Sequence, residues 1–103
     1  MAVIVICQDS DQAPTLRKTL KQAHLKYINT ILAFVSAAGP LNQSVDAMRS
    51  GECDGSAFIY DTNDVAVARK LFENDPYAKG GVYSQVSFAI FKPAAGQWIG
   101  GHH

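Results

Sequence analysis

The feature that most constrains the fold is an apolar run at residues 2–7, whose sequence is AVIVIC. Most of these residues are β-branched, and β-branched residues favour strands. Successive side chains of a strand point to opposite faces of a sheet, and here both alternate sets are apolar. A strand with one face in water alternates apolar and polar residues, which this run does not do. The sequence therefore predicts a first strand that is buried on both faces.

A long amphipathic helix is predicted next, from about residue 14 to about residue 32. Ser10 or Asp11 can serve as its N-cap, and Pro14 suits its first turn. Its apolar stripe recurs at spacings of three and four residues and consists of Leu16, Leu20, Ala23, Tyr27 and Ile31. This stripe is the face that we expect to be buried.

Three further strands are predicted, at residues 34–41, 57–60 and 82–91, and the polar loop 42–56 has room for a short helical turn. In the last strand, alternation places Tyr83 on the mixed face, opposite the apolar face that contains Phe88. The tail 92–99 has room for a short edge strand around Trp98.

A second helix is predicted between the third and the last strand. Thr62 can cap it, and Asp64 falls in its first turn, where negative charge is favoured. The helix must end before Asp75-Pro76, because a residue that precedes proline avoids the helical conformation.

The resulting order of elements, βαββαβ, is that of the ferredoxin-like α+β fold. Such a domain has a four-stranded antiparallel sheet with two helices on one face. Because two helices cover only one face, the other apolar face needs a partner. We expect a second copy of the chain, packed sheet to sheet in a homodimer with a barrel-like centre.

Composition excludes several classes of function. The nine basic and nine acidic residues are scattered without a basic stripe, so no nucleic-acid partner is expected. No apolar run is long enough to cross a membrane, so no membrane partner is expected either. Cys7 and Cys53 form no redox motif or disulfide framework, which makes a cytoplasmic protein the default expectation. We expect one domain over residues 1–99 and regard residues 100–103, which end in two histidines, as a tag remnant.

The same inventory argues against a bound cofactor. His24 is the only histidine outside the suspected tag, so a catalytic zinc site is not expected. The glycine-rich loops that bind phosphate groups are absent. His24 is able to serve as an axial haem ligand, but so short a chain has little wall to enclose a macrocycle. We therefore expect no cofactor and no metal.

Short motifs along the chain identify a family. They are Ala23-His24-Leu25, Ala38-Gly39-Pro40, Asp54-Gly55-Ser56, and Asp75-Pro76-Tyr77 followed by Gly80-Gly81-Val82-Tyr83. In order and spacing they resemble the YciI-like, or YCII-related, family over about residues 2–92. The resemblance implies a dimeric α/β barrel and a catalytic histidine–aspartate pair, here His24 and Asp75. One relative is described as a dehydrochlorinase of a chlorinated hydroxyquinol. Many members carry an arginine where this chain has Lys21, which keeps the charge but loses bidentate recognition of a carboxylate.

The histidine and the aspartate each have a functional and an ordinary interpretation. His24 lies in the middle of the first helix, and imidazole exchanges protons near neutral pH. A carboxylate on its second nitrogen would fix its tautomer. The ordinary interpretation of His24 is a partly buried, hydrogen-bonded side chain. The ordinary interpretation of Asp75 is an aspartate in a turn at a helix end. Sequence spacing alone does not prove that the two side chains meet.

Other residues are weaker candidates for a substrate site. Ser36 and Tyr77 can supply hydroxyl groups near the pair, and Lys21 can supply positive charge. Gly39 and Gly81 allow a ligand to approach the chain closely, although backbone geometry explains both glycines as well.

Two functions of different classes remain open at this stage. The first is a cofactor-free enzyme that uses His24 and Asp75 for elimination, isomerisation or hydrolysis of a small molecule. The alternative is a non-catalytic homodimeric module that binds a small ligand in the same cleft. A third possibility, an accessory domain of a larger enzyme, has no sequence feature in its favour.

Overall fold

The computed structural model describes residues 1–97 and 101–102 and shows the predicted α+β architecture. The elements are β1 (Ala2–Asp9), α1 (Ala13–Ile31), a 3₁₀ turn η1 (Leu32–Phe34), β2 (Val35–Leu41), α2 (Val45–Arg49), β3 (Gly55–Tyr60), α3 (Val65–Glu73), α4 (Pro76–Lys79), β4 (Tyr83–Phe91), β5 (Ala95–Gly96) and β6 (Gly101–His102). The predicted edge strand around Trp98, and His103 of the suspected tag, lie outside the described residues.

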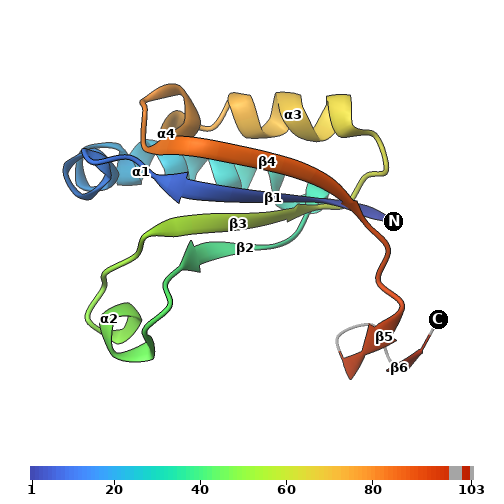
Figure 1. Ribbon diagram of the computed structural model, residues 1–103. Coiled ribbons are helices and arrows are strands. Elements are labelled where there is room, and N and C mark those ends of the chain that lie inside the picture. The colour runs from blue at the N-terminus through green and yellow to red at the C-terminus, as the bar shows by residue number, and fades with distance from the viewer. Residues whose placement is uncertain (98–100, 103) are drawn as a thin grey trace.

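Four strands form one antiparallel sheet in the order β2-β3-β1-β4, which is the ferredoxin-like order. Helices α1, α3 and α4 lie on one face of this sheet (Figure 1). The main core lies between the helices and the sheet, where Phe58 of β3 packs edge-on against Phe72 of α3 and Val5 of β1 belongs to the same cluster. The four-stranded α+β prediction is confirmed.

The other face of the sheet is apolar and partly open. Ile4 lies opposite Ile59, and Ile6 lies opposite Ala57, on the face that alternates with the core residues. Ile6 on this face remains accessible to solvent, since 42% of the residue is exposed. The strand patterns therefore occur as predicted, with apolar residues on both sides of the sheet.

The predicted caps of the two long helices were wrong. Helix α1 begins after Gln12 without a side-chain cap, because the Ser10 hydroxyl donates to the carbonyl of Gly81 instead, at 2.9 Å. Helix α3 is capped by Asp64, whose carboxylate accepts from Ala66 N–H at 2.9 Å. Thr62 acts one step earlier, since its hydroxyl accepts from the N–H of Asp64. Ala23, predicted to be buried in the stripe of α1, is exposed.

The position of Tyr83 also differs from the prediction. The register between β1 and β4 shifts between Gln8 and Asp9, so that Asp9 pairs with Tyr83. Such a bulge changes which face the next side chain takes. Tyr83 therefore packs against Phe58 and Phe72 in the core instead of on the open face.

Helix α4 was not predicted. The chain stops being helical at Asn74, as expected before a proline, but becomes helical again at Pro76. Proline suits the first position of a helix, and Asp75 immediately before it acts as the N-cap. In the part of the chain that the structure describes, no helix is long and apolar enough to cross a membrane.

Candidate active site: a His–Asp pair in a basic cleft

A histidine on α1 and the N-cap aspartate of α4 are in direct contact. Nδ1 of His24 lies 2.7 Å from Oδ1 of Asp75, a distance typical of a charge-assisted hydrogen bond. The Asp75 side chain is fully buried, whereas 16% of the His24 side chain is exposed. The pair thus has one buried anionic end and one end that solvent or a ligand can reach.

The capping role of Asp75 fixes the carboxylate in place. Oδ1 accepts the backbone N–H of Tyr77 at 2.9 Å, which is the usual bond of an N-cap side chain. Pro76 restricts Asp75 to the extended conformation, observed at φ −67° and ψ 130°. Asp75 Oδ1 therefore both caps the N-terminus of α4 and holds His24.

The imidazole of His24 is held in orientation by an aromatic ring. It stacks on the ring of Tyr77 with centroids 3.8 Å apart and planes 3° from parallel. The Tyr77 hydroxyl donates in turn to the carbonyl of Arg17 at 3.3 Å, which ties α4 back to α1. Since a carboxylate only accepts hydrogen bonds, Nδ1 carries a hydrogen, and the ring nitrogen left for a substrate is Nε2.

His24 faces a cleft of about 1020 Å³ between α1 and the connection from β2 to β3. One wall comes from the face of α1 that carries Arg17, Lys18, Lys21 and His24. The opposite wall is built from residues 38–40 of β2 and parts of the segment 42–53. This volume is at the upper end of the range for sites that enclose small molecules.

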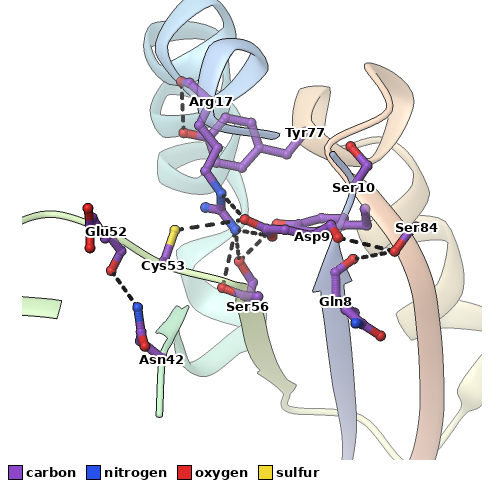
Figure 2. A network of polar contacts seen from close by, with 12 residues as sticks. Gln8, Asp9, Ser10, Arg17, Asn42, Glu52, Cys53, Ser56, Tyr77 and Ser84 are labelled. Atoms are coloured by element: carbon purple, nitrogen blue, oxygen red, sulfur yellow. Dashed lines mark hydrogen bonds and ion pairs between the residues drawn. The ribbon is translucent and has the colours of Figure 1, made fainter. Parts of the chain in front are cut away.

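The floor of the cleft holds a dense polar network around Arg17 (Figure 2). The guanidinium donates to both carboxylate oxygens of Asp9, through Nε at 2.9 Å and through Nη2 at 2.7 Å. Nη2 also donates to Ser56 Oγ at 3.0 Å and to the carbonyl of Gly55 at 3.2 Å. Such a two-pronged pair with a carboxylate fixes the plane of the guanidinium.

The network leaves two donor groups without a partner among residues 1–97. Nη1 of Arg17 makes no hydrogen bond to a described residue. Ser56 Oγ accepts from Arg17 and from the hydroxyl of Tyr83 at 3.1 Å, so its own hydrogen remains available. Both residues line the cleft that contains His24.

Arg17 remains positively charged although it is partly buried. Burial opposes the charged form, but the hydrogen bond and the negative charge of Asp9 outweigh it and raise the pKa of the guanidinium. Lys18 and Lys21 line the same wall, and neither forms an ion pair with a described residue. Asp9 is neutralised by Arg17, so two lysines and one acidic residue, Glu52, remain along the described lining. The balance is positive and favours an anionic or oxygen-rich ligand.

The cysteines are not activated as nucleophiles in this site. Cys53 lines the cleft, and its thiol lies 4.0 Å from Asp9 Oδ2, but burial raises its pKa. Burial also raises the pKa of Cys7, to about 12. A reactive cysteine needs the opposite shift, because the thiolate is the nucleophile.

The structure separates the residues singled out in the sequence into two groups. Lys21, Gly39 and Tyr77 line the cleft together with His24. Ser36 and Gly81 do not. Ser36 is exposed beside an irregularity in the pairing of β2, and Gly81 occupies a turn with φ +86° and accepts a hydrogen bond from Ser10.

Arg17, Asp9 and Ser56 were not among the candidate site residues predicted from the sequence, although Ser56 ends the family motif Asp54-Gly55-Ser56. A signal for Arg17 was present, because residues 17, 21, 24 and 28 share one helical face and all line the cleft. Asp9 and Ser56 follow less directly, since their proximity to Arg17 depends on the pairing of β1 with β3.

Comparison with solved structures places this fold among known ones. The 5-chloro-2-hydroxyhydroquinone dehydrochlorinase TftG of Burkholderia phenoliruptrix AC1100, solved with 2,5-dihydroxybenzoquinone, superposes with a TM-score of 0.80 at 22% identity, over 94% of this chain and 97% of that one. Protein Atu4242 of Agrobacterium tumefaciens gives a TM-score of 0.55 at 12% identity, over 90% and 92% of the two chains. An uncharacterised NIPSNAP domain protein of Burkholderia xenovorans gives 0.50 at 14% identity, over 92% and 96%. No curated protein sequence matches the chain.

Fold and site together define a ferredoxin-like α+β domain that presents a His–Asp pair in a basic cleft. The model of the YCII-related domain matches residues 1–92. The chain belongs to the YCII-related family, as its short motifs predicted.

Proposed function

We propose that this protein is an enzyme that moves a proton on a small, oxygen-rich molecule, with His24 as the general base and acid. The observation that carries the proposal is the 2.7 Å contact between Asp75 and a histidine that faces a cleft. A histidine that serves only in packing is not expected to have a buried carboxylate on one ring nitrogen and a cleft at the other, whereas a catalytic histidine is.

The proposed chemistry starts with the neutral imidazole. His24 Nε2 takes a proton from a carbon or hydroxyl of the substrate, and the positive charge that develops on the ring is stabilised by the adjacent carboxylate of Asp75. The electron pair left on the substrate either expels a leaving group, which gives an elimination, or shifts within the molecule. In the second case His24 returns the proton at another position, which gives an isomerisation. In a hydrolysis His24 would instead deprotonate a water molecule, which attacks the carbonyl carbon of an ester or lactone; the C–O bond breaks and the leaving oxygen takes the proton back from His24. In each of these reactions His24 itself moves the proton, and no cofactor belongs to the proposal.

Arg17 and Ser56 are suited to hold the oxygens of the substrate. The free donors of Arg17 Nη1 and of the Ser56 hydroxyl belong to groups that Asp9 and Tyr83 already hold in place. Donors fixed in advance stabilise negative charge that develops on a substrate oxygen without reorganising during the reaction. Lys21 and Lys18 extend this positive field along the same wall.

The comparison with TftG supports the chemical class. That enzyme is named for removing hydrogen chloride from 5-chloro-2-hydroxyhydroquinone, and its structure holds 2,5-dihydroxybenzoquinone. Such rings carry oxygens for Arg17 and Ser56 and a proton for His24. We therefore propose hydroxylated rings and related enolisable molecules as the substrate class.

The test is a survey of candidate substrates with the purified protein. The panel contains 5-chloro-2-hydroxyhydroquinone, other halogenated hydroquinones and small lactones, with chloride release and deuterium exchange in D₂O as the readouts. We expect at least one compound to exchange or react faster than in buffer. If no compound does so while one of them binds unchanged in the cleft, the protein is a ligand-binding module and the catalytic proposal is wrong.

We further propose that the protein works as a homodimer joined through the open sheet face. The apolar residues Ile4, Ile6 and Ile59 on that face support this assembly. We expect light scattering to give twice the 11.1 kDa mass of the chain. The change Ile6→Glu should give a monomer, because a sheet-to-sheet dimer would bury the unpaired charge of the glutamate. Val67→Glu on α3 is the matched control, since Val67 is 43% exposed but lies on the helical side. A wild-type mass of one chain would contradict the proposal.

A cytoplasmic location belongs to the same proposal. It is supported by Cys7 and Cys53, which are both free cysteines.

A further inference from the structure

Two buried polar atoms in the core lack a hydrogen-bond partner in the described part of the chain. They are the hydroxyl of Tyr60 and Oδ2 of Asp75, and both residues are 0% exposed. A buried polar atom without a partner costs about 1–3 kcal/mol, so native structures pair nearly all of them. Two such atoms close to a candidate catalytic pair call for an explanation.

The two unpaired atoms have complementary chemistry. Asp75 Oδ1 already accepts from His24 Nδ1–H and from Tyr77 N–H, whereas Oδ2 accepts from neither. The carboxylate therefore lacks a donor on one side. The Tyr60 hydroxyl is a donor that lacks an acceptor.

The fold brings the two side chains to one region. Tyr60 and Phe72 are members of the same buried core cluster, and the backbone N–H of Asp75 donates to the carbonyl of Phe72 at 3.1 Å. Burial is the main cause that raises the pKa of Tyr60, and the negative charge of Asp75 is the next, as expected for two groups buried in the same region.

The neighbouring Tyr27 does not fill this role. Its hydroxyl donates to the carbonyl of Leu71 at 2.7 Å, so its hydrogen is already used. Among the tyrosines whose pKa the charge of Asp75 raises, Tyr77 and Tyr83 are likewise engaged, with Arg17 and Ser56. Tyr60 is the member of this group with a free donor in the described structure.

We propose that the Tyr60 hydroxyl serves Asp75 Oδ2 through one buried water molecule, which makes Tyr60 a positioning residue for the His24–Asp75 pair. Tyr60 donates to the water, and the water donates to Oδ2. A bridging water satisfies both atoms without a direct contact, and buried waters normally occupy such polar sites. This role rests on the proposed function, since it concerns the same pair.

The link sets how much negative charge Asp75 presents to His24. A donor on Oδ2 draws charge toward that oxygen, so Oδ1 holds the His24 hydrogen less strongly than an unassisted carboxylate would. It also prevents the carboxylate from rotating about its bond to Cβ. The carboxylate therefore keeps Oδ1 directed at the imidazole.

The test compares Tyr60→Phe with Tyr27→Phe by proton NMR of protein labelled with ¹⁵N-histidine. The readout is the downfield resonance of the His24 Nδ1 hydrogen, followed at low temperature. We expect this resonance to move further downfield in Tyr60→Phe, because Oδ1 becomes the stronger acceptor. In Tyr27→Phe we expect it to stay in place, although both variants should melt at lower temperature than the wild type.

One result overturns the proposal: a His24 resonance that moves no more in Tyr60→Phe than in Tyr27→Phe. A hydroxyl that truly had no partner would also make Tyr60→Phe more stable than the wild type. If Tyr60→Phe does not fold, nuclear Overhauser contacts between a bound water and the Tyr60 ring in the wild type replace the comparison, and their absence overturns the proposal. Since none of these measurements uses turnover, they distinguish failure of the water link from failure of the catalytic proposal.

Discussion

Replacing His24 with glutamine is expected to lower turnover of the best substrate by roughly 10²–10⁴-fold, the usual contribution of a general acid–base group. Glutamine has no side-chain group that takes up and returns a proton at neutral pH. Its amide N–H can still donate to Asp75 Oδ1, so the buried carboxylate keeps a partner and the fold should survive. The measurement is the initial rate on the most reactive compound of the substrate survey, beside a thermal melt.

The matched control for this change is Gln22→Ala. Gln22 is exposed on the same helix and does not line the cleft. It should leave both the rate and the melting temperature close to those of the wild type. Wild-type turnover in His24→Gln would show that the imidazole takes no part in the reaction.

The second large effect is expected at Asp75, where two substitutions separate charge from structure. Asp75→Asn keeps an oxygen for the N–H of Tyr77 but removes the negative charge that stabilises a protonated His24. We expect turnover to fall roughly 10²–10⁴-fold with a small loss of stability. Asp75→Ala removes the cap of α4 and the partner of His24 together, which costs about 2 kcal/mol in the free energy of unfolding. That cost corresponds to a drop of roughly 10 °C in the melting temperature.

Asp64 provides a control of the same residue type. It caps α3 through Ala66 N–H, as Asp75 caps α4, but it lies outside the cleft. Asp64→Ala should therefore lower the melting temperature without lowering turnover at a temperature where the protein is folded. If Asp75→Asn turns over substrate at the wild-type rate, the carboxylate is a helix cap and has no part in the chemistry.

The outline of the fold was predictable because it depends on patterns that repeat along the chain. Apolar residues on both faces of the first strand, and the βαββαβ order, were enough to predict the antiparallel sheet and its open apolar face. The features that were missed depend on single residues. Tyr83 reaches the core because of one bulge in the pairing of β1, and no periodicity reveals an irregularity of that kind.

The candidate site was predictable only in part, for a similar reason. His24 and Asp75 came from the family motifs, but their contact depends on α4, a helix of four residues that is too short to show a periodic pattern. Arg17 could have been found from its place on the His24 face of α1. Its partner Asp9 ends β1, and its partner Ser56 lies 39 residues further along the chain on β3. Only the pairing of β1 with β3 brings these two side chains together beside Arg17.

The two walls of the cleft differ in what holds them, and this difference bears on how new substrate preferences arise in such a domain. The wall that carries His24 is fixed by α1 and by the cap of α4, so changes there disturb folding together with the proposed chemistry. The facing wall comes from an edge strand and from the connection that carries the five-residue helix α2, which stands apart from the layered body (Figure 1). Insertions in that connection alter the shape of the cleft at little cost to the rest of the chain. The domain can therefore diversify by lengthening one loop while the proposed His24–Asp75 pair is inherited unchanged.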